Sequence, residues 1–116
     1  MPQFLYRVQP ARPEFFGGPT AVEEAAVGEH FAYLEALTRR RVVLLAGRTL
    51  NENSSAFGIV IFEASSDAAA RDLMARDPAV RAGVFLAELF PYRIALASPH
   101  LLDLAPPLNT LREGEI

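Results

Sequence analysis

The chain has 116 residues, 51% of them hydrophobic, and a formal net charge of -3 at pH 7. This length and composition fit one folded domain with a single core, and they argue against a disordered chain or a basic surface for nucleic acid. All eleven cationic residues are arginines and there is no cysteine, which excludes lysine Schiff bases, disulfides and thiolate catalysis.

The first third of the chain predicts a strand, a loop and a long helix. Residues 3–9 alternate between two faces, as in a strand, whereas residues 10–19 contain three prolines and two glycines and predict a loop. Thr20 and Glu23 have the spacing of a capping box, so a helix should begin there. Its apolar stripe recurs every three or four residues and consists of Val27, His30, Phe31, Leu34 and Leu37.

Residues 42–50 and 57–63 are rich in β-branched and aliphatic side chains and predict the two strands of a hairpin. Both faces of these strands are apolar. Two helices on connected crossovers cover only one face of a sheet, so the other apolar face needs a second layer. We therefore expect a homodimer in which two sheets pack face to face. In the first strand, one face would carry Val42 and Leu44 and the other Val43 and Leu45. In the second strand, one face would carry Ile59 and Ile61 and the other Val60 and Phe62.

A second helix and a fourth strand follow the hairpin. Ser65 or Ser66 is expected to cap this helix, because serine accepts a hydrogen bond from the first free amides. The helix should end near Arg76, since Pro78 disfavours the helical conformation of the residue before it. Residues 84–96 then predict the last strand.

The order strand, helix, strand, strand, helix, strand predicts an α+β fold, the ferredoxin-like βαββαβ plait, over residues 1–96. Pro91 cannot donate to a ladder, so the last strand is expected to lie at a sheet edge or to contain a bulge. Residues 97–116 form a tail rich in proline and leucine, which we expect to dock on the body or on a partner subunit. Its leucines are Leu101, Leu102, Leu104, Leu108 and Leu111, and residues 112–116 are expected to be disordered.

Five short motifs follow one another along the predicted plait: HFAYL at 30–34, AG at 46–47, EA at 63–64, DP at 77–78 followed by AGVF at 82–85, and PYR at 91–93. Together they resemble the YCII-related (YciI-like) domain family, and the resemblance covers residues 3–96. It implies a dimeric α+β barrel with a cleft that holds a His–Asp pair, here His30 and Asp77, which is proposed to be catalytic in the family. It also implies a small ligand, since some relatives act on chlorinated or hydroxylated aromatic compounds.

His30 and Asp77 are the candidate catalytic residues, and each also has a purely structural interpretation. A histidine titrates near neutral pH and can move protons, but a core histidine often only pairs with backbone groups. Asp77 is expected to cap a helical turn that begins at Pro78 and ends at Gly83. The roles of Asp77 are compatible, because one carboxylate oxygen can cap the turn while the other contacts the imidazole.

Three arginines and two phenylalanines are the candidate substrate-binding residues. Arg48 and Arg93 are expected on strands near the cleft, where each forms either a weak surface ion pair or a clamp for an anionic ligand. Arg7, on a central strand, must find a carboxylate or a cavity. Phe15 and Phe16 form either a lid over the cleft or a hydrophobic plug at the end of the sheet.

These residues are compatible with three functions. The first is a cofactor-free enzyme of the isomerase, lyase or dehalogenase type, in which His30 moves a proton of a small aromatic or carboxylated molecule and Asp77 orients the imidazole. The second is a non-catalytic ligand-binding or accessory homodimer, and the third is an interaction module that uses the leucine-rich tail.

Histidine and cysteine counts argue against a metal site, because one chain offers two histidines and no thiolate. The first residues lack a signal pattern and no apolar run reaches membrane-spanning length. We therefore expect a cytoplasmic protein without membrane, nucleic-acid or metal partners.

Overall fold

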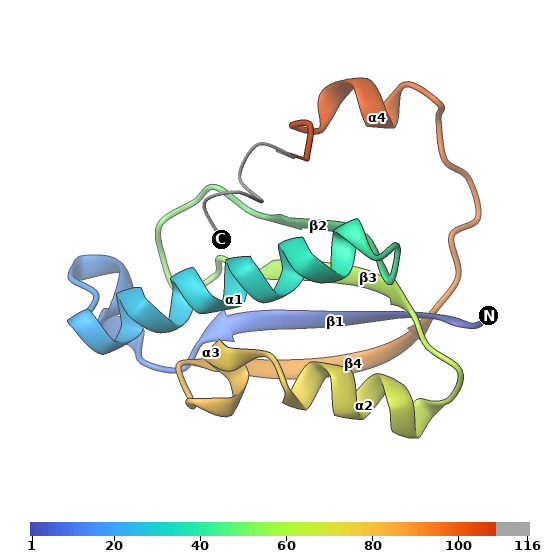
Figure 1. Ribbon diagram of the computed structural model, residues 1–116. Coiled ribbons are helices and arrows are strands. Elements are labelled where there is room, and N and C mark those ends of the chain that lie inside the picture. The colour runs from blue at the N-terminus through green and yellow to red at the C-terminus, as the bar shows by residue number, and fades with distance from the viewer. Residues whose placement is uncertain (109–116) are drawn as a thin grey trace, which may run out of the picture.

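The computed structural model describes residues 1–108 as one four-stranded antiparallel sheet with helices on one face (Figure 1). The strands lie in the order β2-β3-β1-β4, and α1 and α2 both cover the same face. This arrangement confirms the predicted α+β plait. In chain order the elements are β1 (Gln3–Pro10), the 3-10 helix η1 (Pro13–Gly17), α1 (Ala21–Arg39), β2 (Val43–Arg48), β3 (Gly58–Glu63), α2 (Asp67–Ala75), α3 (Pro78–Arg81), β4 (Phe85–Tyr92) and α4 (Leu101–Leu104).

The core lies between the helices and the inner face of the sheet. β1 alternates as its sequence predicts, because Phe4, Tyr6 and Val8 are buried whereas the residues between them are only half-buried. They pack with Val60 and Phe62 of β3 and with apolar side chains of the helices. The two largest fully buried side chains, Tyr6 and Phe62, therefore come from the two central strands.

The helix ends follow the predicted capping signals. Thr20 accepts a hydrogen bond from the Glu23 amide, and the Glu23 carboxylate accepts one from the Thr20 amide, which completes the capping box. Ser66 caps α2, which ends at Ala75. Gly83 follows α3 with a φ of 76°, a left-handed conformation that glycine adopts without strain.

Two details of the predicted pattern are wrong. A β-bulge separates Val43 and Leu45, so Leu44 has no cross-strand partner and the strict alternation of this segment is broken. Phe31 is 59% exposed instead of buried. The buried side of α1 is rotated relative to the predicted stripe, because its first half packs against α3 as well as against the sheet, and this side consists of Glu23, Ala26, Leu34 and Leu37.

The outer face of the sheet is also apolar, and α1 and α2 leave it uncovered (Figure 1). The strand register aligns Leu45 with Ile61, Ile61 with Leu5, and Leu5 with Phe90. One apolar row therefore crosses all four strands. Pro91 lies in β4, which is an edge strand, as its missing amide proton predicts.

The tail does not dock on the body within the described residues. α4 stands apart from the sheet and from α1 (Figure 1), and Leu102 and Leu104 are 82% and 70% exposed. Leu111 and residues 112–116, to which the predicted docking and disorder also refer, lie outside the described residues. Among residues 1–108, no helix has both the length and the hydrophobicity needed to cross a membrane.

Candidate functional site

His30 and Asp77 lie in direct contact. α1 carries His30 on the side that faces α3, and the turn between α2 and α3 carries Asp77. The distance from His30 Nδ1 to Asp77 Oδ2 is 2.6 Å. Asp77 is fully buried, whereas the His30 side chain is 14% exposed. The carboxylate thus lies behind the imidazole, which alone reaches the surface.

Asp77 accepts hydrogen bonds from two other groups besides its contact with the imidazole. Its Oδ1 accepts a hydrogen bond of 3.0 Å from the Ala79 amide, which is the capping interaction at the start of α3. Its Oδ2 accepts a second bond, of 2.7 Å, from the hydroxyl group of Tyr6 on β1. One carboxylate therefore joins β1, α1 and α3, and it caps a helix while it contacts the imidazole, as the sequence predicted.

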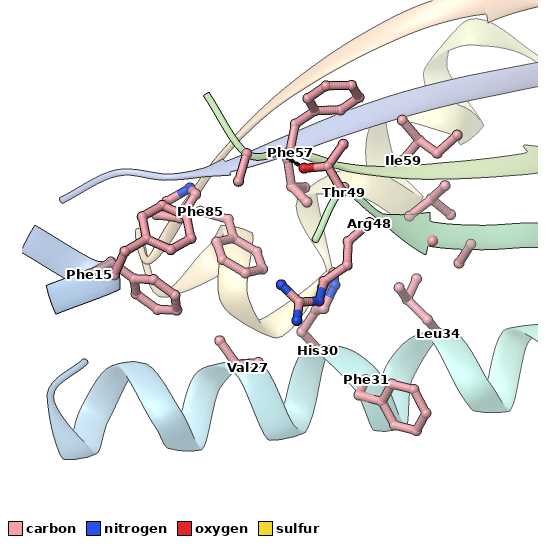
Figure 2. A pocket seen from close by; sticks show the side chains of 18 residues that line it. Phe15, Val27, His30, Phe31, Leu34, Arg48, Thr49, Phe57, Ile59 and Phe85 are labelled. Atoms are coloured by element: carbon pink, nitrogen blue, oxygen red, sulfur yellow. Dashed lines mark hydrogen bonds between the residues drawn. The ribbon is translucent and has the colours of Figure 1, made fainter. Parts of the chain in front are cut away.

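His30 forms one wall of a cavity of about 580 Å3 between α1 and the neighbouring ends of β2 and β3 (Figure 2). Its Nδ1 is occupied by Asp77. Within residues 1–108, no group forms a hydrogen bond with His30 Nε2. This nitrogen is not buried either, because the one buried side-chain nitrogen or oxygen without a partner among these residues is Arg7 Nε. Nε2 is therefore accessible, which makes it the atom of the pair that can meet a ligand.

The cavity is lined mainly by apolar side chains, and a row of aromatic rings begins at His30. His30 contacts Phe85 edge to face at 5.1 Å between ring centres, Phe85 contacts Phe15 at 6.3 Å, and Phe15 contacts Phe16 at 5.4 Å. Phe31 and Phe57 also border it, but the Phe57 ring packs against Arg7 on the outer face. The polar groups of the wall are few, and Figure 2 shows Arg48 extending from β2 into the space beside His30.

A salt bridge fixes the loop that brings Phe15 and Phe16 to the cavity. Arg12 donates from Nε and Nη2 to the two oxygens of Glu23, each at 2.8 Å, and Nη2 also donates to the Gly18 carbonyl. This bidentate bridge ties the loop to the first turn of α1. The hydrogen bonds from Arg12 and from the Thr20 amide lower the pKa of the Glu23 carboxyl to about 2.

The Arg12–Glu23 bridge predicts an acid-dependent loss of stability. A carboxyl whose pKa falls from 4.5 unfolded to about 2 folded stabilises the protein above pH 4.5, and this stabilisation is lost as the pH falls towards 2. Glu23→Gln should therefore lower the melting temperature at pH 7 and flatten its decline between pH 4.5 and 2. Thermal melts over this range test this, with Glu24→Gln, an exposed neighbour, as the control. Equal pH profiles for the two variants would contradict it.

The three candidate arginines lie in different places. Arg48 lines the cavity, whereas Arg93 follows β4 at the opposite end of the sheet, next to Gln3 and far from Val8. Arg7 points to the outer face, where its guanidinium lies 5.0 Å from the centre of the Phe57 ring and its Nε has no partner among the described residues. Within residues 1–108, none of the three forms an ion pair with a carboxylate. Phe15 and Phe16 both line the cavity.

Sequence reasoning missed the role of Tyr6, which it treated as one more inward residue of β1. The available signal was chemical, because a buried phenol needs a partner for its hydroxyl group. It also missed Phe85 and Phe57, which line the cavity from the start of β4 and from the residue before β3. The sequence alone does not show whether an aromatic residue at the end of a strand lines a cavity or packs in the core.

Comparison with known proteins gives a family match and a fold match. A family model described as YCII-related domain matches residues 5–91. No protein of curated function matches the sequence significantly. Among solved structures, 5-chloro-2-hydroxyhydroquinone dehydrochlorinase from Burkholderia phenoliruptrix, in complex with 2,5-dihydroxybenzoquinone, is 21% identical with a TM-score of 0.58. The alignment covers 78% of this chain and 93% of that chain.

A second similar protein is SnoaB, a cofactor-independent oxygenase from Streptomyces nogalater, found in two solved structures. Each is 17% identical and the alignments cover 84% of this chain and 95% of those chains, with TM-scores of 0.44 and 0.43. The dehydrochlorinase match supports the fold, that of a dimeric α+β barrel protomer. The chemistry has to be argued from the residues of the cavity.

Proposed function

Because this chain belongs to the YCII-related domain family, and because its His–Asp pair opens into an aromatic cavity, we propose that it is an acid–base enzyme acting on a small molecule. The observation that carries the proposal is the 2.6 Å contact between His30 Nδ1 and Asp77 Oδ2 beside an accessible Nε2. A buried carboxylate behind an imidazole orients the ring and stabilises the imidazolium that forms when Nε2 takes a proton.

Proton transfer through Nε2 supports two reaction types. In an isomerisation, His30 removes a proton from one atom of the substrate and returns it to another. In an elimination or a dehalogenation, it removes a proton, the released electron pair forms a double bond, and the leaving group departs with its own pair of electrons. Asp77 keeps its negative charge in both cases and pairs with the transient imidazolium.

The cavity favours a planar aromatic ligand with an anionic oxygen. Its volume of about 580 Å3 accommodates a substituted ring, and its phenylalanines provide apolar contact area. Arg48 is placed to bind a carboxylate or phenolate oxygen, since guanidinium pairs with such groups through two hydrogen bonds. The dehydrochlorinase that shares the fold binds 2,5-dihydroxybenzoquinone, which supports hydroxylated rings as the first compounds to test.

The test combines a ligand search with a histidine variant. Native mass spectrometry of the purified protein, followed by assays with hydroxylated, chlorinated and carboxylated aromatic compounds, should identify a substrate. His30→Gln should then lower kcat by about 100-fold or more, because general acid–base catalysis contributes on the order of 100 to 10,000-fold. His100→Gln, in the exposed tail, is the matched control. Equal turnover by the parent and His30→Gln would rule out the proposed role.

A non-catalytic ligand-binding domain is the second candidate, and the mostly apolar wall of the cavity favours it. In that case Arg48 and the phenylalanines bind the ligand, and His30 and Asp77 are a structural pair. Ligand affinity would then fall in Arg48→Ala but not in His30→Gln, and no compound of the panel would be converted.

We also propose that the working form is a homodimer through the outer face of the sheet. Its apolar row from Leu45 to Phe90 lacks a covering layer in the described protomer, and uncovered apolar patches mark interaction surfaces.

A further inference from the structure

Tyr6 is buried at the centre of the sheet, and it contacts the candidate site through a single atom. Its ring packs edge to face on Phe62 at 5.7 Å, whereas its hydroxyl group donates to Asp77 Oδ2. Burial, and then the neighbouring carboxylate, raise the pKa of the Tyr6 phenol far above its ordinary value. The phenol therefore keeps its proton over the whole physiological range and acts as a permanent donor.

The hydrogen bond from Tyr6 restricts where the other protons of the site can be. Oδ2 already accepts the phenol proton, and Oδ1 accepts the amide proton of Ala79. An ionised carboxylate that accepts both of these bonds has no proton to offer to His30. The close contact between Nδ1 and Oδ2, at 2.6 Å, then requires a proton on Nδ1, since two unprotonated acceptors at this distance would repel each other.

We infer that Tyr6 is a positioning residue for the site, because its hydroxyl group holds the Asp77 carboxylate in the orientation in which Oδ2 accepts the Nδ1 proton of His30, and because it shares the negative charge on that oxygen. This arrangement leaves Nε2 unprotonated in the neutral ring and directed at the cavity. A general base needs this tautomer, because only an unprotonated Nε2 can accept a proton from a ligand. The inference deepens the proposed function and rests on it for its catalytic meaning, but its structural content can be tested without a substrate.

The test is a histidine NMR titration of the parent protein and Tyr6→Phe. The chain has two histidines, so exposed His100 gives an internal reference in each spectrum. Without the hydrogen bond from the Tyr6 hydroxyl group, the negative charge of Asp77 attracts the protonated imidazole more strongly. The titration midpoint of His30 should therefore rise by about half a pH unit or more, while nitrogen shifts should still show the proton of the neutral ring on Nδ1.

Tyr33→Phe is the matched control. This tyrosine also lies near Asp77, and burial followed by the Asp77 charge raises its pKa to about 12. Its hydroxyl group, however, donates to the Leu73 carbonyl at 2.6 Å and not to the carboxylate. Removing this hydroxyl group should leave the His30 midpoint and tautomer unchanged. An equal effect of both variants, or no effect of Tyr6→Phe in the folded protein, would overturn the inference.

A second substitution keeps the test valid if Tyr6→Phe does not fold. Replacing Tyr6 by 3-fluorotyrosine preserves the hydrogen bond with a more acidic phenol, which donates more strongly to Asp77. The His30 midpoint should then fall instead of rising, and an unchanged midpoint would contradict the inference.

The inference and the proposed function can fail separately. If Tyr6→Phe shifts His30 while His30→Gln retains full turnover, the positioning role is confirmed and the acid–base function is wrong. If His30→Gln abolishes turnover while His30 is unchanged in Tyr6→Phe, the opposite holds.

Discussion

Asp77→Asn is expected to lower the titration midpoint of His30 and to destabilise the protein by about 1–3 kcal/mol, the range for leaving a buried hydrogen-bond donor without its partner. The contact with a carboxylate favours the protonated imidazole, and the amide removes that charge. The Asp77 carboxylate accepts three hydrogen bonds. Asparagine has an NH2 donor in place of one carboxylate oxygen, so at least one of the three donors loses its partner. Urea unfolding and histidine NMR measure the two effects.

The chain contains its own control for this experiment. His100 and Asp103 form a second His–Asp contact, at 3.2 Å, in which both side chains are mostly exposed. Asp103→Asn should change stability by less than about 0.5 kcal/mol, because exposed pairs contribute little. An Asp77→Asn variant as stable as Asp103→Asn, with an unchanged His30 midpoint, would show that the buried contact does not form in solution.

Phe90→Arg is expected to convert the proposed dimer into a folded monomer. Phe90 is 39% exposed on the outer face, so the substitution leaves the protomer core intact. In a two-fold dimer it would place two arginines in one apolar interface. A cost of about 3 kcal/mol would weaken association roughly 100-fold, which sedimentation at micromolar concentration detects.

Val22→Arg is the control for the dimer, because Val22 is 71% exposed on α1, on the other side of the sheet. This variant should sediment like the parent. A parent protein that is monomeric at micromolar concentration would exclude the proposed interface. Val43 and Val60 are unsuitable for this experiment, because both lie in the core under the helices and a charge there would unfold the protomer.

Much of the fold could be predicted because its signals are local. The spacing of Thr20 and Glu23 specifies a helix start whatever lies around it, and Pro91 restricts its strand to an edge through its own missing proton. The double role of Asp77 was also predictable, since the sequence Asp-Pro defines the helix cap and leaves one carboxylate oxygen free.

The remaining features depend on how distant segments meet. The bulge after Val43 arises from the pairing of β2 with β3, and no residue in β2 alone specifies it. Arg7 lies over the Phe57 ring where a carboxylate or a cavity was expected, because the register brings the start of β3 beside it. Arg93 was expected near the cleft, but the antiparallel pairing of β1 and β4 places it at the other end of the sheet.

The three hydrogen bonds at Asp77 make the site a property of the complete fold. Tyr6 is contributed by the first strand, His30 by the first helix, and Asp77 with Ala79 by residues some fifty positions further along. A fragment that ends with α2 keeps His30 but loses its carboxylate, and one that begins after β1 loses the phenol. Local unfolding of the turn that carries Asp77 should therefore leave the imidazole without its carboxylate while the central strands are still folded.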